Sequence, residues 1–100
     1  MLTAESILER LAGNEKQIRD LGVRRIGLFG SFVRDEGREE SDIDILVEFV
    51  EGKRSFDTYM DLKFFLEDLF RRNVDLVDRD AIKPGFRPYI LQSVRYAPGL

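Results

Sequence analysis

The sequence from Leu28 to Val47 reads LFGSFVRDEGREESDIDILV and contains the features that decide the fold and the chemistry. Two apolar runs flank a polar connection, which predicts two β-strands joined by a loop. Gly30-Ser31 ends the first run, and Asp42-Ile43-Asp44 opens the second after ten intervening residues. Side chains two residues apart in a strand point to the same face, so Asp42 and Asp44 are expected to project side by side.

Two carboxylates held this close repel each other unless a cation lies between them. A ligand set made only of oxygen atoms suits Mg²⁺ or Mn²⁺. Gly30-Ser31 provides a small residue and a hydroxyl at a place where a phosphate can approach backbone N–H groups. Together these features predict metal-assisted phosphoryl or nucleotidyl transfer. The alternative is that Asp42 only caps a turn at an exposed junction between loop and strand, where Asp is common.

The chain has 100 residues, which suits one small domain, and we expect residues 1–100 to form a single domain. Its hydrophobic share of 43% is enough for a modest core, and the length leaves little room for a separate substrate-recognition domain. A partner in a homo- or hetero-oligomer is therefore expected to supply that surface. The net charge of −3 argues against direct nucleic-acid binding, which needs a basic face.

Two absent residue types restrict the chemistry further. Without cysteine the chain forms no disulfide and no thiolate zinc site, and without histidine it lacks the commonest general base and transition-metal ligand. Any metal site must therefore be built from carboxylates. The first ten residues lack the apolar stretch of a signal peptide, and no apolar run approaches membrane-spanning length. We therefore expect a cytoplasmic protein that does not enter the membrane.

Apolar periodicity predicts an α+β fold, in which a small mixed β-sheet of about three strands packs with helices. The segment 43–49 is almost continuously apolar and is expected to be a central strand. The expected helices cover residues 3–20, 56–72 and 87–96, the other expected strands cover residues 24–29 and 74–77, and residues 31–36 are expected to form a short helical turn.

A third carboxylate, Asp75, begins the strand that follows the second long helix. For Gly30 and Asp42 to share a site, the first two strands should be adjacent and antiparallel. For Asp75 to join Asp42 and Asp44, the third strand should run parallel to the second, with the helix as a right-handed crossover. Read alone, Asp75 would more often be an ordinary acid at a strand edge.

The signature Gly30-Ser31, ten residues and Asp42-x-Asp44 resembles that of the DNA polymerase β-like nucleotidyltransferase superfamily. The stretches 30–36 and 41–47 are similar to its minimal branch, the minimal nucleotidyltransferases (MNT). The resemblance continues through Val74-Asp75-Leu76-Val77 to the C-terminal segment and covers essentially the whole chain. It is specific because residue types, spacing and flanking strands agree, and it implies the minimal nucleotidyltransferase fold.

The resemblance also implies an activity. MNT proteins act as antitoxins of HEPN-domain ribonuclease toxins, in type VII-like toxin–antitoxin systems, by transferring AMP from ATP to a tyrosine of the toxin. Carried over, Gly30 and Ser31 bind the nucleotide phosphates, Asp42 and Asp44 are catalytic and hold metal, and Asp75 is the third ligand. The expected cofactor is Mg²⁺, as two ions, with Mn²⁺ as a substitute. The sequence shows no motif for recognising a base, so ATP rests on the resemblance alone.

Three other positions have alternative interpretations. Arg34 occupies the place of an arginine that MNT antitoxins have after Gly-Ser-Phe, and it either contacts a phosphate or pairs with a nearby carboxylate. Ser41 either donates to a phosphate or caps the turn before Asp42. Arg71-Arg72 either touches RNA or a toxin surface, or simply suits the end of a helix, where cations are favoured.

Two rival functions remain. The first is an antitoxin that works as a non-catalytic binding module, by complex formation alone. The second is a nucleotidyltransferase that modifies a small molecule, although such enzymes generally have an additional domain for the acceptor.

Overall fold

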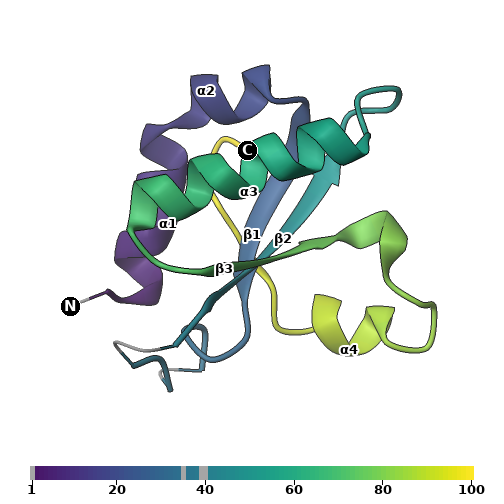
Figure 1. The fold of residues 1–100 in the computed structure, drawn as a ribbon. Helices are drawn as coiled ribbons and strands as arrows, with labels where there is room; N and C mark the ends of the chain where they lie inside the picture. Colours follow the sequence, from purple (N-terminus) through teal and green to yellow (C-terminus); the bar gives the residue numbers. More distant parts are fainter. Residues whose placement is uncertain (1, 35, 39–40) are drawn as a thin grey trace.

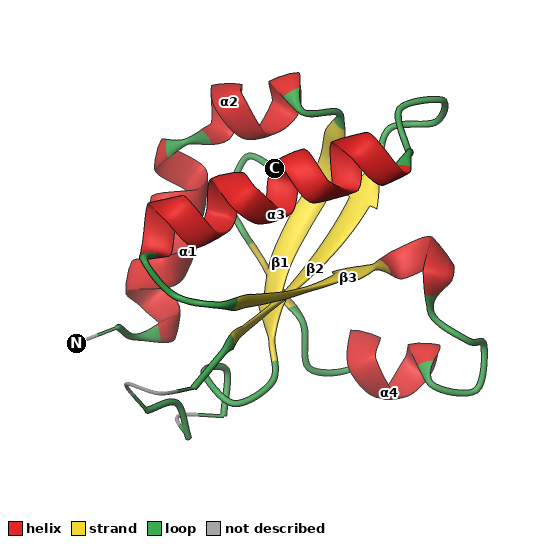
Figure 2. Cartoon of the chain, viewed as in Figure 1, coloured by secondary structure: helices red, strands yellow, loops and turns green. Residues whose placement is uncertain are grey.

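A computed structural model describes residues 2–34, 36–38 and 41–100, which form helices and a single mixed sheet (Figures 1 and 2). The elements in chain order are α1 (Ala4–Gly13), α2 (Glu15–Asp20), β1 (Val23–Phe29), β2 (Ile43–Phe49), α3 (Phe56–Phe70), β3 (Val74–Asp78), the 3₁₀ turn η1 (Arg79–Ala81), α4 (Arg87–Leu91) and β4 (Arg95–Tyr96). In this described part of the chain, no helix is long and apolar enough to cross a membrane.

The sheet has the strand order β3-β2-β1-β4. Strand β1 is antiparallel to β2, and β2 is parallel to β3, with α3 as the connection between them. Both orientations are those that the sequence predicts from the need to bring Gly30, Asp42 and Asp75 together. The α+β fold is thus confirmed, and β2 lies inside the sheet as expected.

The fourth strand is a correction, because the sequence predicts a helix over residues 87–96. The helix ends at Leu91, and the two residues of β4 pair with Leu28 and Gly27 of β1. Gly27 explains this pairing. A Cβ atom at Gly27 would lie 2.8 Å from a methyl carbon of Val94 and 3.1 Å from the Tyr96 ring, so only glycine lets the returning chain cross here.

The first predicted helix is also corrected, since residues 3–20 form two helices rather than one. Helix α1 begins with a capping box in which the side chains of Thr3 and Ser6 each accept from the other's backbone N–H. It ends at Gly13, where the Asn14 side-chain amide donates to the carbonyl of Arg10 (2.8 Å). Glycine is a weak helix former and asparagine competes for backbone carbonyls, so the break has a local cause.

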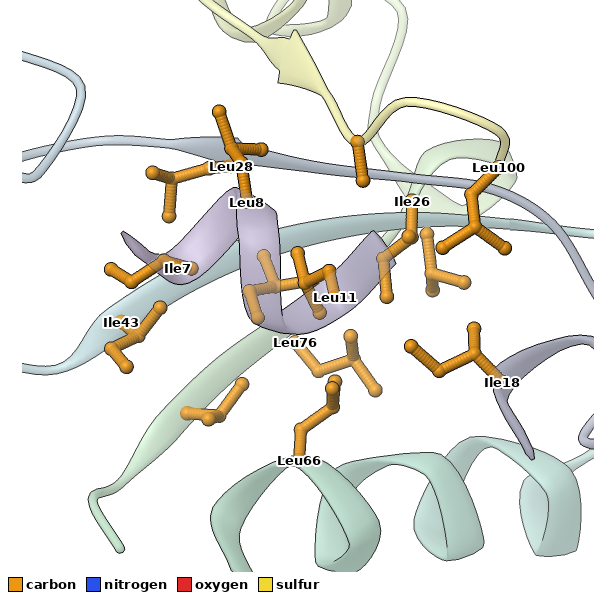
Figure 3. Packing of buried hydrophobic residues seen from close by; sticks show 14 of the residues in the cluster. Ile7, Leu8, Leu11, Ile18, Ile26, Leu28, Ile43, Leu66, Leu76 and Leu100 are labelled. Carbon is orange, nitrogen blue, oxygen red and sulfur yellow. The ribbon is translucent and has the colours of Figure 1, made fainter. Parts of the chain in front are cut away.

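The core lies between the sheet and the first three helices. In Figure 3, Leu11, Ile18 and Leu66 point from the helices into one cluster that also contains Ile26 and Leu76 of the sheet. Along β2, Ile43, Ile45, Val47 and Phe49 belong to this cluster, whereas Asp44, Leu46 and Glu48 do not. Because strand residues alternate between faces, Asp44 lies on the face of the sheet that is turned away from the core.

The free edge of β3 is covered by three polar groups of α3. Tyr59, Lys63 and Glu67 are spaced four residues apart, so they lie along one side of the helix. The Tyr59 hydroxyl donates to the carbonyl of Leu76, and the Lys63 ammonium donates to the carbonyl of Val74. A Glu67 carboxylate oxygen accepts from the backbone N–H of Val74 (3.1 Å). These bonds satisfy backbone groups that an edge strand otherwise leaves open.

This edge contact predicts a pH-dependent contribution to stability. The hydrogen bond from the Val74 N–H, and then Lys63, hold the pKa of Glu67 below its ordinary value. A carboxyl group with a lowered folded-state pKa adds stability above its ordinary pKa, and this contribution is lost as the pH falls through the folded value. We therefore expect Glu67→Gln to lower the free energy of unfolding at neutral pH, and the gap to wild type to close in acid.

Urea unfolding curves recorded across the acidic range would measure this gap. Glu9→Gln, which neutralises an exposed acid on α1, is the matched control and should run parallel to wild type. A Glu67→Gln curve that also stays parallel to wild type would contradict the contribution assigned to this contact.

Candidate active site

The end of β1 and the beginnings of β2 and β3 meet at one end of the sheet. Asp44 of β2 lies opposite Phe29 of β1 on one side and opposite Asp75 of β3 on the other. Residues paired across neighbouring strands point to the same face, so Asp44 and Asp75 are direct neighbours on the face away from the core. Asp42 lies one residue before β2 and is exposed.

Asp44 is the electrostatic centre of this group. It is half-buried, and this burial raises the pKa of its carboxyl above the ordinary value. The negative charge of Asp75 raises the pKa further, and that of Asp42 adds a smaller increase. A hydrogen bond from the Ser31 backbone N–H and the charge of Arg34 act in the opposite direction. Ser31, Arg34, Asp42 and Asp75, which the sequence singles out, therefore all interact with the Asp44 carboxylate.

Gly30 leaves the space that Asp44 occupies. Its φ of +80° is in the left-handed region, which favours glycine. A Cβ atom built at Gly30 would lie 2.7 Å from the carboxyl carbon of Asp44 and still closer to one of its oxygens. The sequence assigns Gly30 only a phosphate contact, and the structure adds that glycine is required for the carboxylate to fit.

Ser31 begins a tight turn next to this carboxylate. Its carbonyl accepts from the backbone N–H groups of Arg34 (3.1 Å) and Glu36 (2.9 Å), while its own N–H faces Asp44. The sequence predicts a short helical turn over residues 31–36, and the structure has a hydrogen-bonded turn at 31–34, with Asp35 outside the described residues. The turn directs a backbone N–H toward the carboxylate group.

Arg34 and Ser41 both make contacts within the protein. The Arg34 guanidinium lies 3.4 Å from the Glu36 carboxylate, and more than half of each side chain is exposed. The Ser41 hydroxyl accepts from the backbone N–H of Arg38 (3.0 Å), and its own N–H donates to the Arg38 carbonyl (3.0 Å). Ser41 therefore closes the turn before Asp42, and a contact of its hydroxyl with a phosphate stays a prediction.

Sequence reasoning missed the part that Arg72 plays at this site. Its guanidinium donates to the carbonyls of Arg38 (2.7 Å) and Ser41 (3.2 Å), and so holds the segment that leads into Asp42. The sequence signal, a pair of arginines after the second long helix, was visible but does not specify a partner 31 residues earlier in the chain.

The donor set fits a hard divalent cation, because carboxylate oxygens are the ligands that Mg²⁺ takes in proteins. Burial, and then the charges of Asp75 and Asp42, disfavour the charged form of Asp44 and raise its pKa, and a bound cation would offset this. As they stand, no three acidic side chains in the described ranges converge in a metal-binding arrangement. The three aspartates thus interact electrostatically, and binding would require their side chains to turn toward a common point.

Comparison with known proteins agrees with the signature. The family described as "Nucleotidyltransferase domain" matches residues 8–97. The protein adenylyltransferase MntA of Thermococcus cleftensis is 43% identical, with 96% of this chain and 97% of that protein aligned. A solved structure assigned to a minimal nucleotidyltransferase has a TM-score of 0.81 and 33% identity, and the match covers 94% of this chain and 95% of that one.

The fold also resembles, more distantly, that of an antitoxin solved in complex with its toxin. The MNT antitoxin bound to a tri-AMPylated HEPN toxin of Shewanella oneidensis has a TM-score of 0.65 and 21% identity, covering 93% of this chain and 73% of that one. At that identity the likeness shows the fold alone. The family match and the close relatives together establish that this chain belongs to the nucleotidyltransferase domain family and is a nucleotidyltransferase of its minimal branch.

Proposed function

We propose that this protein is a Mg²⁺-dependent protein adenylyltransferase that transfers AMP from ATP to a tyrosine of a HEPN ribonuclease toxin and thereby neutralises it. The observation that carries the proposal is the placement of Asp44 opposite Asp75, two residues after Asp42 and beside the Gly30-Ser31 turn. The identity of 43% with a protein adenylyltransferase, over nearly the full length of both chains, supports AMP as the transferred group.

The residues of the site would have the following roles. Asp42, Asp44 and Asp75 would hold Mg²⁺, which when bound neutralises triphosphate charge and makes the acceptor oxygen more nucleophilic. The Gly30-Ser31 turn, with Arg34 at its end, would receive the phosphates. Of the two paired strand carboxylates, Asp75 is exposed and Asp44 is half-buried. Asp75 would therefore accept the proton of the acceptor hydroxyl.

The transfer balances without any further reagent. The tyrosine oxygen forms a bond to the α-phosphorus of ATP, and the bond from that phosphorus to the oxygen bridging to the β-phosphate breaks. Pyrophosphate leaves, and the hydroxyl proton passes to a carboxylate oxygen. The product is a phosphodiester between the tyrosine and adenosine.

The partner is assigned by relation to antitoxins of the same fold. The Shewanella oneidensis complex joins an MNT antitoxin to a tri-AMPylated HEPN toxin. Because ATP and cellular RNA are both present in the cytoplasm, we place the pair there.

The test compares inhibition of the cognate ribonuclease with and without ATP. After incubation with this protein, ATP and Mg²⁺, the toxin should stay inactive once the two proteins have been separated under denaturing conditions and the toxin refolded. Toxin treated without ATP should regain its activity. Equal inhibition in both samples, lost on separation, would contradict transfer and support an antitoxin that acts by binding alone.

A further inference from the structure

A pocket that is lined in part by the loop between Gly30 and Asp42 has a charge opposite to that of the carboxylates. It has a volume of about 690 Å³ and is lined by Arg10, Arg38, Arg71 and Arg72, together with the rings of Phe32 and Phe70. We call it the basic pocket. Figure 1 shows why these residues meet: the N-terminus, the end of α3 and the loop after β1 lie on the same side of the molecule.

Two of the four arginines are held in place by aromatic rings. The Arg72 guanidinium carbon lies 5.4 Å from the centre of the Phe32 ring, and that of Arg10 lies 6.0 Å from the centre of the Phe70 ring. Both rings are almost completely buried, so they form a fixed floor. Arg10 also donates to the carbonyl of Leu69 (3.5 Å). An arginine stacked on a ring and anchored to a carbonyl loses less freedom when it binds a ligand.

The charges of the basic pocket are not paired among the residues that the structure describes. Arg34, Arg54 and Arg79 each have a carboxylate within 4 Å, whereas none of the four pocket arginines has one in the described ranges. Glu39 and Glu40, which follow Arg38 in the sequence, lie outside those ranges, so their effect is tested below. The four arginines concentrate positive charge at this pocket although the chain as a whole has a net charge of −3.

We propose that the basic pocket is a second ligand site, which binds the phosphate group of a nucleotide or of a phosphodiester. The guanidinium fork matches phosphate oxygens, and four forks around one cavity provide many unused donors. The volume suits a nucleotide-sized ligand. Phe32 directly follows Ser31, and Arg72 holds the segment before Asp42, so the pocket is connected to the carboxylate group through these segments but contains none of its aspartates. This site goes beyond the proposed transferase function.

The test measures binding of a fluorescein-labelled triadenylate by fluorescence anisotropy, with EDTA present. Without a metal ion the aspartates repel anions, so binding under these conditions reports the basic pocket. The variant Arg38→Gln/Arg71→Gln removes two exposed pocket charges. The matched control is Lys16→Gln/Arg24→Gln, which removes two exposed charges from α2 and β1. Thermal unfolding would confirm that both variants fold.

The wild type and the control should bind with the same affinity, whereas the pocket variant should bind about tenfold to a hundredfold more weakly. If AMP competes at a concentration similar to that of unlabelled triadenylate, the ligand is a free nucleotide. If only unlabelled triadenylate competes, the ligand is the phosphodiester. No binding by wild type, or equal weakening in the control, would overturn the proposal. An affinity that is low in the wild type and rises strongly in Glu39→Gln/Glu40→Gln would also overturn it, because the arginines would then serve to pair with those two acids. Since no transfer is measured, failure here leaves the transferase proposal intact.

Discussion

Replacement of Asp44 by asparagine is expected to abolish AMP transfer while the domain stays folded. Asparagine keeps an oxygen that can accept from the Ser31 N–H but removes the charge that would bind a cation. Losing metal assistance costs several kcal/mol of transition-state stabilisation, so the rate should fall at least about a hundredfold.

The same substitution should leave stability unchanged or raise it at neutral pH. Burial and the charge of Asp75 raise the folded-state pKa of Asp44, so the charged form is disfavoured in the folded protein. A raised carboxyl pKa means that stability decreases as the pH rises through the folded value, and asparagine removes this loss. Urea unfolding at neutral pH measures it, with Asp61→Asn on the exposed side of α3 as the control. A destabilised Asp44→Asn variant, or one that still transfers AMP at the wild-type rate, would contradict this view of the site.

Replacement of Gly30 by alanine is expected to have the second-largest effect. A non-glycine residue in the left-handed region costs about 1–2 kcal/mol in backbone strain alone. At Gly30 the added Cβ would also collide with the Asp44 carboxylate and force it to move. Displacing a catalytic group by about 1 Å can lower a rate by about a hundredfold, so we expect a loss of that size in transfer.

Gly52 provides a control for this variant. Its φ of +85° is close to that of Gly30, yet a Cβ at Gly52 meets no atom within 4 Å. Gly52→Ala should therefore show the backbone strain without loss of transfer, and Gly30→Ala should be less stable than Gly52→Ala. If both variants have the same free energy of unfolding and both transfer AMP, this would contradict the prediction that transfer needs the close packing of Gly30 on Asp44.

Where local pattern and tertiary contact agree, the sequence is a sufficient guide. The central strand β2 has the bounds that its apolar run predicts, and the opposition of Asp44 and Asp75 follows from one helix-length connection between parallel strands. The α3 helix begins at the predicted residue because Ser55 caps it. In each case the information lies within one element or its immediate connection.

Apart from the local break between α1 and α2, the errors arise where distant residues decide. Strand β4 forms because Gly27, far earlier in the chain, leaves room for Val94 and Tyr96. Tyr59 and Lys63 look like part of an apolar stripe, and only the edge of β3 explains their polar ends. The basic pocket collects arginines from three separate segments, which no periodicity connects.

The most direct test of the central claim is the intact mass of the cognate HEPN protein after incubation with this protein, ATP and Mg²⁺. The account predicts a gain of one or more AMP-sized increments with wild type and none with Asp42→Asn/Asp44→Asn. An unchanged mass with wild type, while a stable complex forms, would contradict it, as would an equal gain with the double variant.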